Sequence, residues 1–166
     1  RVVAAGRAIG ADLRIVATRF EPQGLEVRFG FEGTSHDVKL NLVGGFQAAN
    51  VAVAAGLAIA TGVAPDQVFA TLPRLTGVRG RMELAARRAN GAAIYVDYAH
   101  TPDALATAVD ALRPHCDGQL VVAFGAGGDR DPGKRPLMGA AVAGRADMAI
   151  VTDDNPRSED PATIRA

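Results

Sequence analysis

The stretch from Ala92 to Thr152 contains three short apolar runs, AAIYV at 92–96, LVVAF at 120–124 and MAIVT at 148–152. Helix-forming sequence follows each run, at residues 102–112, 135–143 and 161 onward. Continuous apolar runs are typical of strands whose two faces are both covered. Strands that alternate with helices predict a parallel sheet with right-handed crossovers. We therefore expect an α/β chain in which these three runs share one parallel sheet.

Polar residues follow each of the three predicted strands, over residues 97–103, 125–135 and 153–160. Ligands of open parallel sheets bind beyond the carboxyl ends of the strands, so the three clusters predict one binding edge. The glycines of the second cluster allow a backbone to pass close to a ligand. The alternative is that the clusters are solvated loops, in which Thr101 and Asp160 cap the helices that follow.

Residues 13–42 have the pattern of antiparallel strands. Leu25, Val27, Phe29 and Phe31 alternate with polar residues, as do Val38, Leu40 and Leu42. Residues 33–35 are the predicted hairpin turn, and Leu13–Thr18 is a further predicted strand. The Ala-rich segment 47–60 and the short segment 64–71 predict helices. Residues 73–81 resemble a loop, and we place a domain boundary there, between residues 79 and 80.

Composition excludes several classes of protein. The 166 residues carry 18 basic and 18 acidic side chains, and 48% of the residues are hydrophobic. These values exclude a disordered chain and a nonspecific nucleic-acid binder. The longest apolar run, residues 51–60, is too short to insert across a membrane. A single cysteine, Cys116, excludes an internal disulfide framework. The chain does not begin with Met, and we expect it to be a fragment of a longer protein.

Three common catalytic patterns are missing. Residues 125–130 have Arg where a dinucleotide fingerprint has its third glycine. The three histidines and Cys116 lack the spacing of zinc ligands, and no nucleophile elbow of the form G-x-S-x-G is present. Hydride transfer, zinc chemistry and Ser-His-Asp hydrolysis are therefore not favoured.

Three longer motifs carry a resemblance to a known family. They are YVDYAHTPD at 95–103, GGDRDPGKRP at 127–136 and DNPR at 154–157. Together they resemble the Mur ligases, and among these the members that add meso-diaminopimelate. The resemblance implies that residues 1–79 are the C-terminal part of a central ATP-binding domain. It implies that residues 80–166 are the N-terminal part of a Rossmann-like, amino-acid-binding C-terminal domain.

The same resemblance implies an activity. It is ATP-dependent formation of an amide bond between UDP-N-acetylmuramoyl-L-alanyl-D-glutamate and meso-diaminopimelate, through an acyl phosphate, in peptidoglycan synthesis. The phosphate loop of the family is not found in residues 1–166. We expect that loop, the carboxylated lysine and the Mg²⁺ ligands upstream, and we expect the fragment alone to be inactive. A monomer in the bacterial cytoplasm is the expected state, with no nucleic acid among its partners.

Site residues follow by resemblance, residue by residue. For ATP, Asn50 is expected at adenine, Arg81 at the phosphates and Asp97 at the ribose hydroxyls, with His100 near the nucleotide. Gln47 stands where the family pattern has Asn, so its role is open. Lys134 and Arg135 are either phosphate contacts or charges in the first turn of a helix.

A second set of residues is expected to bind meso-diaminopimelate: Arg130, Asp154, Asn155, Pro156 and Arg157. Arginine pairs with a carboxylate through two parallel hydrogen bonds, which suits the distal carboxylate that lysine lacks. The alternative is that Arg157 only contacts the backbone of its own loop and that Arg130 is solvated.

Two other functions remain possible from the sequence. One is a related ligase that adds lysine, or glutamate in folate metabolism, which the DNPR segment disfavours. The other is a nucleotide- or amino-acid-binding module without catalysis, which the missing phosphate loop favours for this chain by itself.

Overall fold

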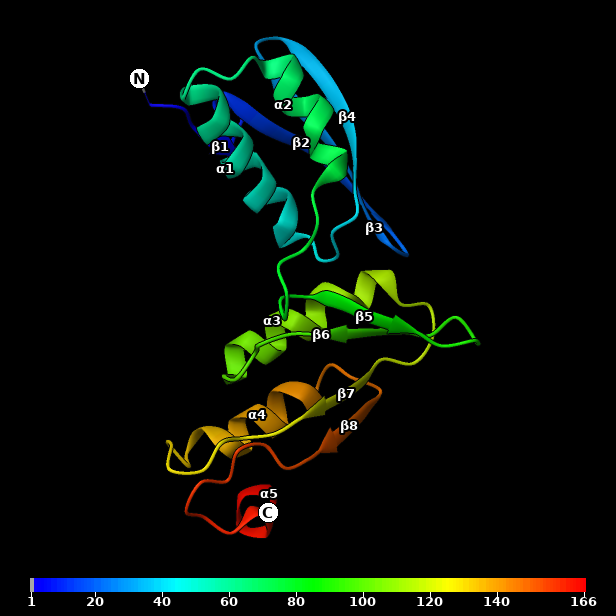
Figure 1. Ribbon diagram of the computed structural model, residues 1–166, viewed down its shortest axis with the longest axis vertical. Coiled ribbons are helices and arrows are strands. Elements are labelled where there is room, and N and C mark those ends of the chain that lie inside the picture. The colour runs from blue at the N-terminus through cyan, green and yellow to red at the C-terminus, as the bar shows by residue number, and fades with distance from the viewer. Residues whose placement is uncertain (1) are drawn as a thin grey trace. The chain divides into compact units, whose positions relative to one another are not determined.

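The computed structural model describes residues 2–166 (Figure 1). Its residues fall into two units, the first ending at Val96 and the second spanning Asp97–Ala166. The first unit contains a four-stranded sheet, two helices and a hairpin. Their bounds are β1 Ala5–Gly6, β2 Leu13–Glu21, β3 Gly24–Phe31, β4 Thr34–Leu40, α1 Phe46–Ala60, α2 Pro65–Thr71, β5 Glu83–Arg87 and β6 Ala93–Val96.

The predicted alternation places one face of the sheet in the core. The strand order is β1-β2-β3-β4, with β1 parallel to β2 and the other pairs antiparallel. Leu25, Val27 and Phe29 are buried, and α1 and α2 cover this face (Figure 1). The helices over 47–60 and 64–71 are confirmed within a residue at each end.

The hairpin turn lies one residue earlier than predicted. Glu32 and Gly33 form it with backbone φ of 47° and 78°, while Thr34 already pairs with Phe31 in the sheet. Positive φ at both central residues is the conformation of a type I′ turn, whose twist matches that of the paired strands. The prediction of a turn over residues 33–35 is therefore wrong.

The second unit alternates strands and helices as expected. Its elements are α3 Pro102–Leu112, β7 Val121–Phe124, α4 Lys134–Ala143, β8 Met148–Val151 and α5 Pro161–Arg165. β7 and β8 are parallel, and α4 lies beside them (Figure 1). Leu105, Met138, Val142 and Ile164 form the core. The predicted caps are confirmed, because the Thr101 and Asp160 side chains accept from Ala104 N and Thr163 N.

The run at 92–96 forms β6, which pairs with β5 in an antiparallel hairpin that the sequence did not predict. The sequence of β5, ELAAR, is made of good helix formers, so local preference gives no sign of the strand. The hairpin supplies β6 with a neighbour close in sequence. Among residues 2–166, no helix is both long and apolar enough to cross a membrane.

Candidate functional site

Asn50 lies on the exposed side of α1, one turn after Gln47. Its side-chain nitrogen donates a hydrogen bond to Gln47 Oε1 at 3.1 Å. Side chains three residues apart are neighbours on a helix, so the pair forms without help from other elements. The sequence left the role of Gln47 open. In the structure its side chain accepts a hydrogen bond from the side chain that is predicted to bind adenine.

Arg81 lines an open groove of the first unit. Gln47 lines the same groove, so Arg81 lies near the Gln47–Asn50 pair. Gly80 N donates to Glu83 Oε2 at 2.7 Å and Arg81 N donates to Val78 O at 3.0 Å, which holds this segment in a tight turn. Sequence reasoning did not single out the other polar residues of the groove, which include Gln23, Asn41, Arg74, Thr76 and Tyr95.

The second unit begins with the segment that carries Asp97 and His100. Asp97 Oδ1 accepts from Ala99 N at 2.9 Å, and His100 Nδ1 lies 2.9 Å from the Tyr98 carbonyl oxygen. Lys134 Nζ donates to the His100 carbonyl at 3.1 Å. This bond joins the first polar cluster to the second. Lys134, whose role the sequence left open, thus holds the 97–101 segment against the start of α4.

The loops after β7 and β8 lie in direct contact. Gly128 N donates to Asn155 O at 2.9 Å. A Cβ on Gly128 would lie 1.9 Å from Pro156 O, and one on Gly125 would lie 2.7 Å from Thr152 O. The second and third polar clusters therefore meet at one edge of the sheet, as predicted. Gly125 and Gly128 therefore have a packing role that the sequence did not show. A larger residue at either position would collide with the backbone of the loop after β8 and keep the two loops apart.

Side chains reinforce the contact between these loops. Ser158 Oγ donates to Asp129 Oδ1 at 2.6 Å and Ser158 N donates to Asp129 Oδ2 at 3.3 Å. Asp129 N donates to Glu159 Oε1, which also accepts from Arg135 Nη2 at 2.8 Å. The Arg135 side chain is only 13% exposed. Arg135 thus forms an ion pair with Glu159. The sequence had left two roles open for it, a phosphate contact and a charge in the first turn of a helix.

Arg157 has contacts on only part of its guanidinium group. Nη1 donates to Gly128 O, and the backbone N donates to Asn155 Oδ1 at 3.3 Å. Among residues 2–166, Nε and Nη2 have no hydrogen-bond partner. Arg130 is exposed, and its Nη1 donates to Asp129 O at 3.2 Å. The Arg157 side chain contacts the backbone of the loop after β7, at Gly128, and not the backbone of its own loop as the alternative supposed. Among residues 2–166 this contact leaves Nε and Nη2 without a partner.

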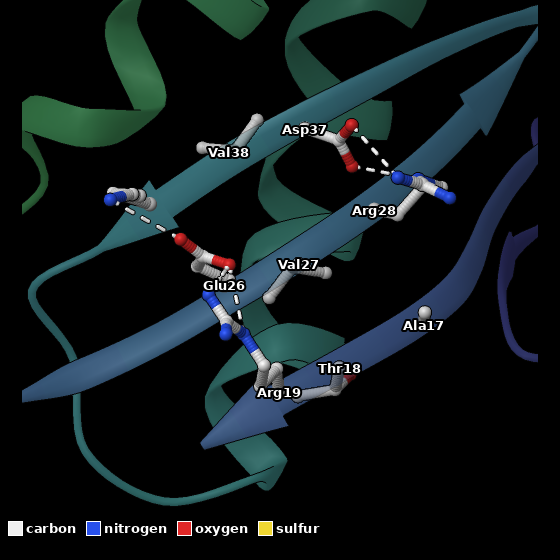
Figure 2. A pocket seen from close by; sticks show the side chains of 9 residues that line it. Ala17, Thr18, Arg19, Glu26, Val27, Arg28, Asp37 and Val38 are labelled. Atoms are coloured by element: carbon white, nitrogen blue, oxygen red, sulfur yellow. Dashed lines mark hydrogen bonds and ion pairs between the residues drawn. The ribbon is translucent and has the colours of Figure 1, made fainter. Parts of the chain in front are cut away.

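A second groove lies on the outer face of the four-stranded sheet (Figure 2). Figure 2 shows Arg28 paired with Asp37 and Glu26 paired with Arg19. Arg28 Nε lies 2.7 Å from Asp37 Oδ1, and Lys39 Nζ lies 3.3 Å from Glu26 Oε1. These pairs are direct cross-strand neighbours in the register of β2, β3 and β4. All five charged side chains of this groove are engaged with one another, so it offers no unpaired charge to a ligand.

Comparison with known proteins identifies the chain. Residues 80–166 match the family model described as Mur ligase, glutamate ligase domain. The chain belongs to the Mur ligase family. Curated relatives include two enzymes named UDP-N-acetylmuramoyl-L-alanyl-D-glutamate–2,6-diaminopimelate ligase. That of Caulobacter vibrioides is 55% identical over 157 residues, 95% of this chain and 32% of the relative. That of Zymomonas mobilis is 54% identical over 153 residues, 92% of this chain and 32% of the relative.

Solved structures agree with this membership. A structure of a UDP-N-acetylmuramoyl-L-alanyl-D-glutamate–2,6-diaminopimelate ligase is 37% identical, with a TM-score of 0.69 over 95% of this chain and 32% of its own. MurF from Acinetobacter baumannii is 20% identical, with a TM-score of 0.72 over 89% of this chain and 33% of its own, and shows the fold alone. The predicted α/β fold is confirmed. The chain spans about a third of the length of the curated relatives it matches.

Most of the predicted site lies in the part that matches the Mur ligase model. Arg81, Asp97, His100, Arg130 and residues 154–157 fall within residues 80–166, and Asn50 falls outside. The roles given to these residues stay predictions. The described residues 2–166 contain no group of three or more His, Cys, Asp or Glu side chains arranged to hold a metal ion.

Sequence reasoning did not predict the side-chain contacts that join the loops after β7 and β8. Asp129 and Ser158 are 29 residues apart, and Arg135 and Glu159 are 24 apart. No local spacing pattern covers such distances. The only available signal was position: Ser158 and Glu159 directly follow the DNPR segment, and Asp129 follows the glycines that contact it.

The carboxylates of this loop contact predict a loss of stability in acid. The Arg135 guanidinium, followed by the Asp129 N–H, holds the pKa of Glu159 below its ordinary value of 4.5. Ser158 holds the pKa of Asp129 below 3.8. A pKa lowered by folding gives stability that is present above the unfolded pKa and is lost as the pH falls through the folded one. We expect the melting temperature to be level from pH 7 to about pH 5 and to fall below about pH 4.

Thermal unfolding of residues 1–166 at constant ionic strength would check this. Glu159→Gln should reduce the difference in melting temperature between pH 7 and pH 3. Asp117→Asn is the matched control, because Asp117 is exposed and has no hydrogen-bond or ion-pair partner among residues 2–166. An equal pH dependence in the Glu159→Gln variant and the wild type would contradict the prediction.

Proposed function

We propose that this chain is part of an ATP-dependent ligase that joins meso-diaminopimelate to UDP-N-acetylmuramoyl-L-alanyl-D-glutamate in peptidoglycan synthesis. Residues 1–79 would be the end of its central domain, and residues 80–166 the first part of its C-terminal domain. The family model begins at residue 80, whereas the contacts group the β5–β6 hairpin with the first unit. The names of the relatives, at 54–55% identity, support the choice of substrates.

One observation carries the proposal from the structure itself. The DNPR loop is fixed against the glycine loop, and the Arg157 side chain is held there by Nη1, while Nε and Nη2 have no partner among residues 2–166. Nε and Nη2 carry the parallel N–H groups that take a carboxylate side-on. Asp154 and Asn155, on the same loop, supply oxygens suited to the distal ammonium group. These groups match the distal amino-acid end that distinguishes diaminopimelate from lysine.

The proposed reaction has two steps, a phosphoryl transfer from ATP and a displacement of phosphate by an amine. The γ-phosphoryl group of ATP passes to the D-glutamate carboxylate, giving an acyl phosphate and ADP. The amine of diaminopimelate then attacks the carbonyl carbon, loses a proton, and expels inorganic phosphate. Most of the rate enhancement in such reactions comes from holding the groups in place and from stabilising charge. This chain would contribute by holding the amino acid.

Contacts to ATP are proposed for four residues. Asn50 would contact adenine, with its amide held by Gln47. Arg81 would contact the phosphates, where a planar guanidinium suits spread negative charge. Asp97 would accept from the ribose hydroxyls, with His100 close by on a segment that Lys134 holds.

Two further parts of the proposal concern the metal and the setting. Mg²⁺ is proposed to accompany ATP, as the family resemblance implies, and the residues that would hold it are not assigned within this chain. We propose a monomeric enzyme in the bacterial cytoplasm, where ATP and the uridine nucleotide are available.

A ligation assay with the full-length protein tests the proposal. ATP, UDP-N-acetylmuramoyl-L-alanyl-D-glutamate and meso-diaminopimelate should give the tripeptide product by mass spectrometry, with one phosphate released for each product. Residues 1–166 alone should show no turnover. Asp97→Ala in the full-length protein should raise KM for ATP at least about tenfold, because hydrogen bonds to a charged group are lost, and should leave KM for the amino acid nearly unchanged.

The outcomes separate the alternatives. If the protein forms product with lysine and not with diaminopimelate, the proposed amino-acid substrate is wrong and lysine takes its place. ATP binding without product from any amino acid would favour a binding module. Turnover by residues 1–166 alone would contradict the division of the active site that the proposal requires.

A further inference from the structure

Two non-glycine residues with left-handed backbone lie at the loop contact. Asp129 has φ of 52° and Arg157 has φ of 50°. This conformation is uncommon for residues with a side chain and is kept only where surrounding contacts hold it. Asp129 is on the loop after β7 and Arg157 on the loop after β8. The two strained positions therefore need an explanation in the contacts between the loops.

The Asp129 carboxylate supplies that contact. Both of its oxygens accept from Ser158, one from the hydroxyl at 2.6 Å and one from the backbone N–H at 3.3 Å. Ser158 directly follows Arg157 in the chain. The carboxylate thus fixes the peptide unit on the C-terminal side of Arg157 and, with it, the direction in which the Arg157 side chain leaves the backbone.

The N-terminal side of Arg157 is fixed as well. Its backbone N donates to Asn155 Oδ1, and Nη1 donates to Gly128 O, the residue before Asp129. With both sides held and Nη1 engaged, the guanidinium plane has little freedom. The edge formed by Nε and Nη2 is then presented without a partner among residues 2–166. A pre-oriented edge loses less conformational entropy when it pairs with a carboxylate.

We propose that Asp129, acting through Ser158, is a positioning residue that orients the Arg157 guanidinium toward the distal carboxylate of the amino-acid substrate. This inference rests on the proposed function. Asp129 itself does not contact the substrate in this account. Its removal leaves the Arg157 charge in place but takes away a negative charge that interacts with it. Loss of that negative charge alone would favour binding of a carboxylate, so weaker binding of the distal carboxylate would report the changed orientation.

Substitutions of Asp129 in the full-length protein test the proposal. Asp129→Ala removes both acceptors, and KM for meso-diaminopimelate should rise about tenfold, the effect expected for hydrogen bonds of this kind. KM for ATP should stay within about twofold of the wild type, since no ATP contact is assigned to this loop. The ratio of kcat/KM for diaminopimelate over lysine should fall, because lysine has no distal carboxylate to misalign.

Two further variants separate the effect of the Asp129 carboxylate from the effect of the left-handed backbone at this position. Asp129→Gly relieves the left-handed strain but lacks the acceptors, so it should behave like Asp129→Ala. Asp129→Asn keeps one acceptor oxygen and tolerates positive φ, so it should restore most of the wild-type KM. Asp110→Asn is the matched control, because Asp110 pairs with an arginine of the same unit, Arg145, at 3.2 Å. It should change none of these values.

Several results would overturn the proposal. One is a ratio of kcat/KM for diaminopimelate over lysine that is unchanged in Asp129→Ala, while kcat changes or KM for diaminopimelate and KM for ATP change by the same factor. Another is wild-type behaviour of Asp129→Gly. If Asp129→Ala does not fold, Ser158→Ala removes the 2.6 Å hydrogen bond alone and must show the same change in the ratio. A wild-type protein that does not ligate diaminopimelate refutes the proposed function. If Arg157→Ala loses the preference for diaminopimelate over lysine and Asp129→Ala keeps it, only the positioning role of Asp129 is refuted.

Discussion

Replacing Arg157 by alanine in the full-length protein is expected to lower kcat/KM for meso-diaminopimelate about a hundredfold or more. Arg157 is exposed in this structure, and the bound amino acid would bury its pair with the distal carboxylate; losing one partner of such a pair costs roughly 2–5 kcal/mol. The structure supports a large effect because Nε and Nη2 of Arg157 have no partner within residues 2–166, while Nη1 donates to Gly128 O. The affinity for ATP should change little. The preference for diaminopimelate over lysine should narrow, which steady-state kinetics with both amino acids would measure.

Two variants control for charge and for local structure. Arg157→Lys keeps the charge but not the parallel N–H groups, so it should recover only a small part of the loss. Arg145→Ala removes another exposed arginine of the same unit that also donates to a backbone carbonyl, that of Ala141. It should leave the kinetics unchanged. If Arg157→Ala kept the full preference for diaminopimelate, the distal carboxylate would have to be bound elsewhere.

Gly128→Ala is expected to have the second large effect. The added Cβ would lie 1.9 Å from Pro156 O and 2.6 Å from Pro156 C, and backbone atoms cannot rotate away. The two loops must move apart, which breaks the Gly128–Asn155 hydrogen bond and displaces Arg157. Misplacing a binding group by about 1 Å costs about a hundredfold in rate. We expect that loss in kcat/KM for diaminopimelate, together with a lower melting temperature.

The control for this variant lies nearby in sequence. Gly139 is in α4, and a Cβ there would meet nothing within 4 Å. Gly139→Ala should therefore stabilise the protein by about 1 kcal/mol, because alanine is the better helix former, and should leave activity unchanged. Wild-type kinetics in Gly128→Ala would mean that the close approach of the two loops does not matter for amino-acid binding.

The sequence by itself determined the elements whose signal is local. Alternating Leu25, Val27, Phe29 and Phe31 identified the buried face of β3, because strand side chains alternate with a period of two. The apolar runs located β6, β7 and β8, and Thr101 and Asp160 marked the starts of two helices. The motifs at 95–103, 127–136 and 154–157 indicated the Mur ligase family, which the family model confirms.

Only the tertiary structure decided which partners these elements and side chains take. β6 pairs with β5, whose sequence favours a helix, because pairing depends on which strand edge lies close and not on local propensity. Arg135 contacts Glu159, and Asp129 contacts Ser158, across 24 and 29 residues. Such contacts form because parallel β7 and β8 bring their carboxyl-terminal loops together at one edge. The sequence named Arg157, but the choice of Nη1 for Gly128 and the open Nε–Nη2 edge follow from that packing alone.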